Sequence, residues 1–359
     1  MALLPIQQNA GRRISQLRSA GWFWAAVGSL ALPAPVAHAD LPGNIFAPAA
    51  TPAKWIFDLS MLVLAVTLAI FIIVGGLLVY ALIRYRSRPQ DSHREPAQIY
   101  GSNQIELSWT VIPILIVVML FLSTTRVVLG TQAIPKPSNA LDVTVIGHQF
   151  WWEYRYPKLG VVTANELHIP VTDSAHPVQT WLTMSSADVA HSFWVPRLAG
   201  KMDVIPNKIN VMWLDPPQAG LYLGQCAQYC GTQHAKMLLR VYAQTQADFD
   251  AWVNQQRQPA RGDFAGNAAA VRGEKVFMQN ACISCHTIAG TAATGRFGPD
   301  LTHLASRDTL GSGAIPNTPE NLRKWIDDPN TLKPGCLMPS MHLNDQDLDD
   351  ITAYLAQLR

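Results

Sequence analysis

Two short segments of the chain carry side chains that can hold metal ions or a metal cofactor. The segment CAQYCGTQHAKM contains Cys226, Cys230, His234 and Met237, which supply two thiols, an imidazole and a thioether. The segment CISCH follows at residues 282–286. Cysteine and methionine sulfur favours copper and iron–sulfur chemistry over hard cations. The sequence therefore predicts two soft-metal sites, and the rest of the chain must position them.

The cysteine count argues against a disulfide framework. A secreted protein normally pairs its cysteines, but this chain has an odd number, and two pairs are too close in sequence to join distant elements. The five cysteines are Cys226, Cys230, Cys282, Cys285 and Cys336. Metal ligation explains the spacing of the first four better than disulfides do. Cys336 has no neighbouring cysteine, and we expect it to be a small buried apolar residue.

The composition indicates a protein that is partly embedded in a membrane. Of the 359 residues, 49% are hydrophobic and only 14% are charged, whereas soluble domains average about 25% charged residues. The net charge of +2 gives no reason to expect a nucleic-acid partner.

The N-terminus has the pattern of a secretory signal peptide. Three arginines precede an apolar run at residues 21–32, and the small-residue sequence Ala37-His38-Ala39 follows. This pattern predicts a signal peptide over residues 1–39. The alternative is a short membrane anchor, but the apolar run is shorter than the ~20 residues that a spanning helix needs.

Two later segments are long and apolar enough to cross a bilayer. We expect a transmembrane hairpin over residues 55–130, with helices at about 57–84 and 106–127. The connecting loop carries Arg84, Arg86, Arg88 and Arg94. Cytoplasmic loops are enriched in Lys and Arg, so this loop is expected in the cytoplasm. The two metal-binding segments then lie outside, in the compartment to which the signal peptide would also deliver the chain.

The pattern of the sequence changes twice after the hairpin. Short β-rich runs separated by Pro, Gly, Asn and Asp extend from about residue 140 to 241 and predict a sandwich or barrel. Residues 256–268 read as a polar linker rich in Ala and Gly. From residue 269 to 359 the pattern is helical with long loops.

The first metal segment holds more sulfur than a mononuclear copper site needs. A blue-copper site uses one Cys, two His and a weak axial Met. Here a second thiol is present, and a second imidazole is available upstream as His191 in SSADVAHSFWVP. Cys226 and Cys230 could bridge two coppers, with His191 and His234 as terminal ligands and Met237 and a main-chain carbonyl as weak donors. Zinc is the alternative metal, but zinc has little use for a thioether.

These motifs resemble the dinuclear CuA domain of cytochrome c oxidase subunit II. The resemblance rests on DVAHSF and on the C-x-x-x-C-G-x-x-H-x-x-M loop, and it covers residues 55–245. It implies a cupredoxin sandwich at residues 138–245, in which Gln228 contributes its backbone carbonyl to copper. Glu106 matches an acid of the family near the mouth of a proton pathway, although a solvated acid at a helix end is an equally good interpretation.

The chain departs from the family at two positions. Gln228 replaces the usual Glu, which leaves the carbonyl contact intact but puts the neighbouring magnesium site of the family in doubt. Phe150 replaces the Trp that usually receives electrons from a docked cytochrome. Trp151 and Trp152 follow it, and they are candidates either for the electron path or for core packing.

The second segment has the spacing of a haem c attachment site. In C-x-x-C-H, two thioethers fix the porphyrin and the adjacent His binds iron, which assigns Cys282, Cys285 and His286. A zinc or redox motif could have the same spacing. The surrounding sequence resembles class I cytochrome c, and the resemblance implies that Met338, in KPGCLMPSM, is the sixth ligand. Met341 is the competing candidate.

Together, the chain resembles subunit II of a caa-type oxidase, in which a cytochrome c is fused behind the CuA domain. The resemblance implies a bacterial inner-membrane protein with both metal domains in the periplasm. Electrons would pass from haem c through CuA to haem a of subunit I, where oxygen is reduced. Subunit III and an electron donor, such as a cytochrome bc complex or a small cytochrome c, are the other implied partners. A covalent tether would replace bimolecular docking by a high effective concentration.

Two other functions remain open from the sequence. One is the CuA subunit of a nitric oxide reductase, which would share this domain but have a different catalytic partner. The other is a membrane-anchored protein that handles copper or senses redox state and passes no electrons to an oxidase. The catalytic chemistry of an oxidase or reductase would lie on another chain, so this sequence does not identify the terminal acceptor.

Overall fold

The computed structural model describes residues 43–86, 95, 98, 100–173, 176–260, 264 and 266–359. The predicted signal peptide at residues 1–39 lies outside the described residues. So do Arg88 and Arg94 of the loop between the apolar helices.

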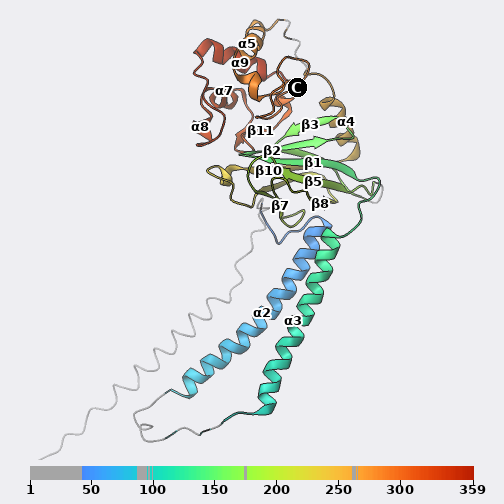
Figure 1. The fold of residues 1–359 in the computed structure, drawn as a ribbon, viewed down its shortest axis with the longest axis vertical. Coiled ribbons are helices and arrows are strands. Elements are labelled where there is room, and N and C mark those ends of the chain that lie inside the picture. The colour runs from blue at the N-terminus through green and yellow to red at the C-terminus, as the bar shows by residue number, and fades with distance from the viewer. Residues whose placement is uncertain are drawn as a thin grey trace, which may run out of the picture. The chain divides into compact units, whose positions relative to one another are not determined.

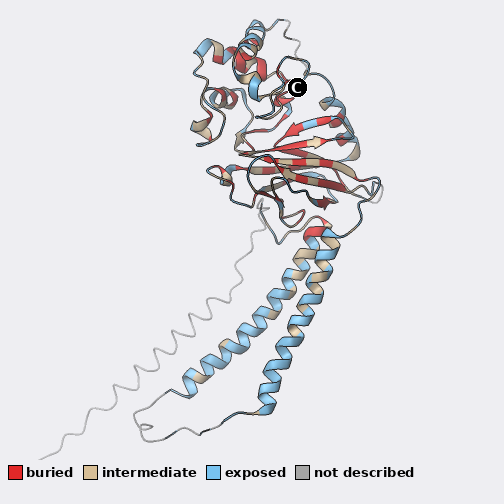
Figure 2. Cartoon of the chain, viewed as in Figure 1, coloured by how far each residue is buried: buried red, intermediate tan, exposed pale blue. Residues whose placement is uncertain are grey.

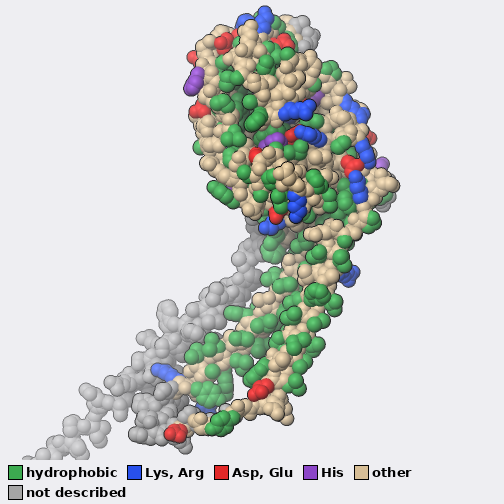
Figure 3. Space-filling model, viewed as in Figure 1, with side chains coloured by type: hydrophobic (Ala, Val, Ile, Leu, Met, Phe, Trp, Pro, Cys, Tyr) green, Lys and Arg blue, Asp and Glu red, His purple; other side chains and the backbone are tan. Residues whose placement is uncertain are grey.

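Two long apolar helices come first, as predicted (Figure 1). Helix α2 spans Thr51–Arg84 and helix α3 spans Asn103–Gln132, and each extends beyond its expected range. Both are long and apolar enough to cross a membrane. Most of their surface is exposed (Figure 2), and hydrophobic side chains cover much of it (Figure 3). Such a surface is stable in lipid, because all backbone hydrogen bonds of a helix are satisfied within the segment.

The ends of the helices next to the sandwich are fixed by specific contacts. A Cβ atom on Gly130 would lie 2.6 Å from the Trp55 ring, so only glycine lets α2 and α3 approach this closely. The Trp55 and Trp213 rings meet edge to face at 6.0 Å. The indole of Trp213 donates a hydrogen bond to the carbonyl of Thr131 at 3.1 Å. The hairpin therefore joins the sandwich through packed aromatic side chains.

The middle of the chain is a sandwich of two five-stranded sheets. The first sheet has the order β3-β2-β1-β5-β8, with β1 Leu141–His148, β2 Trp151–Tyr156, β3 Val161–Ala164, β5 Thr180–Ser186 and β8 Asn210–Leu214. The second has the order β4-β10-β9-β6-β7, with β4 Glu166–Pro170, β6 His191–Trp194, β7 Met202–Val204, β9 Gly220–Cys226 and β10 Leu238–Gln244. The β1–β5 and β4–β10 pairs are parallel and the other strand pairs are antiparallel.

Alternation of side chains explains how the sandwich forms its core. In β10 every second residue is buried, and these are Leu239, Val241 and Ala243. Successive side chains of a strand point to opposite faces of the sheet, so one face of β10 lies in the core. Trp152, Tyr154 and Phe193 fill the space between the sheets with fully buried rings. A short 3-10 helix, η2 at His234–Lys236, lies in the connection between β9 and β10.

Helix α4, Gln246–Gln256, closes the sandwich, and the last part of the chain is mainly helical. Its elements are α5 Ala268–Gln279, α6 Cys282–Cys285, η3 Leu304–Ser306, α7 Pro319–Asp327, α8 Pro329–Leu332 and α9 Asp345–Leu355. Two strands of two residues each, β11 Thr309–Leu310 and β12 Ile315–Pro316, form a small ribbon that the sequence reading did not anticipate.

The helical region is organised by the crossing of α5 and α9. Gly273 of α5 lies so close to the backbone of Asp350 in α9 that any side chain would overlap it. Asp350 also binds Arg272 through two hydrogen bonds of 2.7 Å. Phe277 and Tyr354 pack against each other in the core beside this crossing. The predicted architecture is confirmed: two apolar helices, a β-sandwich and a mainly helical last region.

Candidate metal and haem sites

The soft ligands of the first segment are brought together by the pairing of β6 with β9. These strands are antiparallel, with Phe193 opposite Cys226, so His191 at the start of β6 lies near the end of β9. The loop from Cys226 to Met237, hereafter the copper loop, is closed by a hydrogen bond of 2.9 Å from the Cys226 N–H to the Met237 carbonyl. The loop is therefore a fixed structure that places its ligands beside His191.

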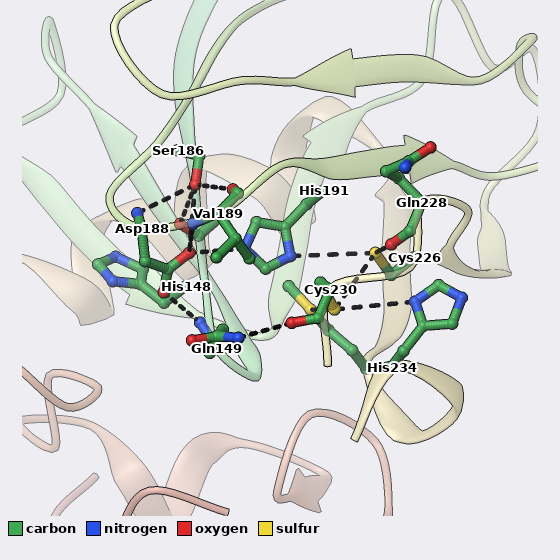
Figure 4. Close-up of polar contacts among 12 residues, drawn as sticks. His148, Gln149, Ser186, Asp188, Val189, His191, Cys226, Gln228, Cys230 and His234 are labelled. Carbon is green, nitrogen blue, oxygen red and sulfur yellow. Dashed lines mark hydrogen bonds and ion pairs between the residues drawn. The ribbon is translucent and has the colours of Figure 1, made fainter. Parts of the chain in front are cut away.

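All six predicted copper ligands converge (Figure 4). The Cys226 and Cys230 sulfurs are 4.0 Å apart. Two ligand atoms lie near the Cys226 sulfur: His191 Nδ1 at 4.0 Å and the Gln228 carbonyl oxygen at 3.2 Å. Two others lie near the Cys230 sulfur: His234 Nδ1 at 3.7 Å and Met237 Sδ at 3.8 Å. Figure 4 also shows that the Gln228 side chain extends away from the two sulfurs, so only its carbonyl faces the cluster.

The two thiols differ in acidity because they share one buried site. The pKa of Cys226 is lowered to about 3, because the Cys230 thiol hydrogen-bonds to its thiolate and His191 stabilises the same charge. The pKa of Cys230 is raised, because a thiolate at Cys226 lies beside it and because it is buried. Bound metal deprotonates a coordinating thiol outright. Metal binding at this pair would therefore release thiol protons.

Asp188 orients His191, a role that the sequence reading missed. Its Oδ1 accepts a hydrogen bond of 2.8 Å from His191 Nε2, which leaves Nδ1 directed at Cys226. Burial raises the pKa of Asp188, but hydrogen bonds from His191 and two backbone amides outweigh burial and lower it. A carboxylate that holds the second nitrogen of a ligating His is typical of metal sites. The available signal was an acid three residues before His191.

Gln149 is a second residue that the sequence reading missed. Its side-chain Nε2 donates a hydrogen bond of 2.6 Å to the Cys230 carbonyl, and its backbone N–H donates one of 2.6 Å to Asp188. Gln149 therefore stabilises both the copper loop and the position of the Asp188 carboxylate. No spacing rule in the sequence could have shown this, because the contact joins residues that lie far apart along the chain.

This donor set fits copper. His191, Cys226 and Cys230 are buried, and their ligand atoms lie within 4.8 Å of one another. The thioether of Met237 is fully buried against Cys230, which a purely zinc-binding site would not require. Thiolate and thioether ligands together select a soft metal, and this agrees with the copper expectation.

The second segment lines a cavity of about 460 Å³ in the helical region. Cys282, Cys285 and His286 lie on its wall, and so do both sixth-ligand candidates, Met338 and Met341. The structure therefore places the attachment motif and a thioether around one hollow. Both methionines line the cavity, so both are placed to supply the thioether.

His286 is prepared to bind a metal through Nε2. Its Nδ1 donates a hydrogen bond of 2.7 Å to the Pro299 carbonyl, which fixes the ring and leaves the other nitrogen free. Burial lowers the pKa of His286 and so favours the neutral ring, the form that coordinates metals. Gly298 packs against the ring, since a Cβ there would lie 2.5 Å from it.

Arg307 gives an independent indication that the cavity takes an anionic group. Its guanidinium is buried and lines the cavity. One guanidinium N–H donates to the carbonyl of Asp300, but Nε has no hydrogen-bond partner among the described residues. A buried, incompletely satisfied cation is costly, and a haem would supply carboxylate groups that remove this cost. The residues present therefore fit a covalent haem.

The two tryptophans suggested for the electron path lie on different sides of β2. Trp151 lines the haem cavity and stacks on His148 with ring centroids 4.1 Å apart. Trp152 is fully buried and contacts the His191 ring edge to face at 5.8 Å. One of these adjacent residues thus contacts the haem cavity, and the other contacts a candidate copper ligand.

The remaining predicted residues lie at the edges of these sites. Glu106 is exposed in the first turn of α3. Cys336 lines the haem cavity, and its sulfur lies 3.6 Å from the Met338 carbonyl. It is partly rather than fully buried, so the expectation that it is a buried apolar residue holds only in part.

Comparison with known families accounts for three segments of the chain. Residues 40–127 match the transmembrane domain of cytochrome c oxidase subunit II, residues 174–244 match its periplasmic domain, and residues 270–359 match cytochrome c. The chain is 34% identical to cytochrome c oxidase subunit 2 of Alkalihalophilus pseudofirmus over 317 residues, which cover 87% of this chain and 90% of that protein. The chain belongs to the cytochrome c oxidase subunit II family.

Other relatives of this subunit II chain include a second type of oxidase. Cytochrome c oxidase subunit 2 of Bacillus sp. PS3 is 32% identical, covering 77% of this chain and 80% of that protein. Quinol oxidase subunit 2 of Bacillus anthracis is 30% identical, covering 68% and 84%. Among solved structures, the periplasmic domain of cytochrome oxidase subunit II from Bradyrhizobium japonicum is 26% identical and covers 34% of this chain and 97% of that one, with a TM-score of 0.32.

Family membership indicates the cofactors of this subunit II chain and the complex to which it belongs. The periplasmic domain of the family implies copper, and the cytochrome c domain implies haem c. The chain is a membrane-anchored component of an oxidase complex, its family implies association with subunit I, and its sandwich matches the periplasmic domain of the family.

Proposed function

We propose that this subunit II carries electrons from its own haem c through a dinuclear CuA centre to haem a of subunit I, where oxygen is reduced to water. The observation that carries the proposal is the placement of Trp151 and Trp152. Trp151 lines the haem cavity, and its neighbour Trp152 packs on His191. When bound, the haem iron and the copper pair each take up and release one electron.

The residues of the copper loop have separate tasks in this proposal. Cys226 and Cys230 would hold the copper pair through their sulfurs, which lie 4.0 Å apart. His191 and His234 would each hold copper through Nδ1. The Gln228 carbonyl and Met237 would be the weaker donors. The burial of both cysteines excludes water, which limits rearrangement around the metals when the charge changes.

In the cytochrome domain, Cys282 and Cys285 would attach the haem through thioether bonds, and His286 would bind its iron through Nε2. Met338 is the proposed sixth ligand. Trp151 and Trp152 are the proposed path between the two centres. Glu106, at the end of α3 remote from the sandwich, is a proposed site of proton uptake toward subunit I.

The proposed location is a bacterial inner membrane, with α2 and α3 spanning it and both metal domains in the periplasm. Arg84 ends α2 and Arg86 follows it, and these positive charges support a cytoplasmic location for this end. Subunit III and a donor such as a cytochrome bc complex or a small cytochrome c complete the proposed partners.

The decisive experiment counts copper in the purified chain. The proposal expects two coppers per chain and an electron paramagnetic resonance signal in which one unpaired electron is shared equally by both nuclei. One copper, or zinc alone, would exclude the dinuclear site. The function itself is tested by rapid reduction of the haem at several protein concentrations. A rate of copper reduction that is independent of concentration supports transfer within one chain, and a rate proportional to concentration contradicts it.

A further inference from the structure

The cytochrome domain contacts the copper domain through two segments. Residues 308–312 run beside β4 and the start of β10. There the Ser312 hydroxyl donates a hydrogen bond of 3.0 Å to the Leu238 carbonyl, and the Leu238 N–H donates one of 3.2 Å to the Ser312 carbonyl. Residues 332–335 run beside the copper loop, where Gln233 donates a hydrogen bond to the Pro334 carbonyl. Both segments border the haem cavity.

Lys333 is the buried cation of this contact. Its side chain belongs to the loop that leads to Met338, yet only 2% of the residue is exposed. Its ammonium donates hydrogen bonds to the Phe150 carbonyl of the copper domain at 2.9 Å and to the Gly311 carbonyl of the cytochrome domain at 2.8 Å. Among the described residues no carboxylate forms an ion pair with it. Lysine is almost never fully buried unless it is paired, so the two carbonyls must hold it.

The carbonyl that Lys333 binds occupies a central position between the two sites. Phe150 follows Gln149, whose side chain donates to the Cys230 carbonyl, and precedes Trp151 on the wall of the haem cavity. The Phe150 ring also lines that cavity and lies against Gly231 of the copper loop. A hydrogen-bonded and covalent connection thus runs from Cys230 through Gln149 and Phe150 to Lys333, which itself borders the haem cavity.

Glu166 makes the opposite contact, from the copper domain to the cytochrome domain. Its buried carboxylate accepts hydrogen bonds from the backbone N–H groups of Asp308 and Thr309, at 3.1 and 3.0 Å, and from the Thr309 hydroxyl at 2.9 Å. Each domain therefore places one buried charged side chain against backbone groups of the other. Such a reciprocal arrangement favours one relative placement, because a shift of the domains would break the hydrogen bond from Lys333 to Phe150 and those from Asp308 and Thr309 to Glu166.

We infer that Lys333 is a positioning residue that fixes the loop carrying Met338 against Phe150 and so holds the haem cavity at the copper loop. The inference rests on the proposed electron transfer from haem c to copper. It adds that the cytochrome domain acts from one docked position, set by the bond from Lys333 to the Phe150 carbonyl, rather than from a freely moving tether.

The first test measures docking without any electron transfer. In the copper-free, haem-containing full-length chain, Lys333→Met removes both donors but keeps an apolar side chain of similar length. We expect hydrogen exchange of the Asp308 and Thr309 amides, which donate to Glu166 on the other side of the interface, to accelerate about 10-fold to 100-fold, because the charged hydrogen bond from Lys333 to Phe150 between the domains is lost. Lys275→Met is the matched control. This lysine is exposed on α5 of the cytochrome domain, and its replacement should change exchange less than about 2-fold.

Lys333→Gln covers the case in which the methionine variant loses its haem or does not fold. An amide retains one donor group, so exchange should accelerate less than in Lys333→Met but more than in the control. Unchanged exchange at Asp308 and Thr309 in a folded Lys333 variant would overturn the docking role. Acceleration confined to residues 329–338 would also overturn it, because it would show a purely local structural role.

The second test separates positioning from folding. After a light pulse places one electron on the haem of the copper-loaded chain, copper reduction should be at least about 10-fold slower in Lys333→Met, while the absorption spectrum of the haem stays unchanged. Faster amide exchange with an unchanged transfer rate would refute the positioning role and leave the proposed function intact. A transfer rate that depends on concentration in the unsubstituted chain would instead refute the proposed function, whatever the exchange data show.

Discussion

The replacement Asp188→Asn tests how the copper site is organised, because it changes one atom of a side chain that is not a metal ligand. In the structure Oδ1 of Asp188 accepts hydrogen bonds from His191 Nε2 at 2.8 Å and from the Val189 N–H at 2.6 Å. Oδ2 accepts one from the Gln149 N–H at 2.6 Å. An asparagine can keep only one of these oxygens, so its NH2 group must face either His191 or Gln149, both of which are donors.

The size of the effect follows from the loss of one charge-assisted hydrogen bond at a half-buried site. Such bonds contribute about 1.5–3 kcal/mol, which corresponds to a factor of about 10 to 150 in affinity. Replacing partners of metal-bound histidines typically costs about 10-fold to 100-fold in metal affinity. The asparagine oxygen can still accept the hydrogen bond from His191 if the NH2 group faces Gln149, in which case the hydrogen bond from the Gln149 N–H is lost. We therefore expect copper affinity to fall about 10-fold, near the lower end of both ranges.

The assay is competition for copper between the protein and a chelator of known affinity, with thermal unfolding of the metal-free protein measured in parallel. Asp203→Asn, an exposed aspartate on β7, is the matched control and should leave the affinity unchanged. Equal affinities of the Asp188 variant and the unsubstituted protein would show that Asp188 does not orient His191. A loss of affinity accompanied by an equal loss of stability of the metal-free protein would also refute the argument, since the effect would then lie in the fold.

Three other predictions concern ligands and topology. Gln228→Ala should leave the copper resonance signal nearly intact, because only the carbonyl faces the sulfurs, and loss of the signal would show that the side chain binds copper. Met338→His should lower the haem reduction potential, because imidazole favours ferric iron more than a thioether does. Met341→Leu should leave the potential unchanged, and the reverse pattern would make Met341 the ligand. A reporter fused at Asp91 should be active in the cytoplasm and one fused at Gly262 in the periplasm, and the opposite result would invert the proposed topology.

The copper ligands could be predicted from the sequence because most of them belong to one loop. Cys226, Cys230, His234 and Met237 are close along the chain, so their spacing alone limits the geometry. His191 required a further step, because it reaches the loop only through the pairing of β6 with β9. His191 could nevertheless be assigned, because the DVAHSF segment around it resembles the corresponding segment of the family. The haem motif could be predicted for the same reason as the loop, because its two thiols and its imidazole lie within five residues of sequence.

The residues that support these ligands could not be predicted in the same way. Asp188 and Gln149 are ordinary polar residues in loops, and their roles depend on backbone conformation rather than spacing. Lys333 and Glu166 were missed for a different reason. Both residue types are mostly exposed, and a sequence gives no sign that one is buried until the domain that covers it is placed. The sequence indicated a tether between the domains, and the structure adds an interface.

The copper loop is covered on one side only, which has a consequence for maturation. Thr232, Gln233 and Lys236 contact the cytochrome domain, whereas Tyr229, between the two cysteines, is 74% exposed. Contact with the cytochrome domain therefore leaves the Tyr229 side of the loop exposed. Delivery of copper from that side would still require the loop to open, because Cys226 and Cys230 are buried.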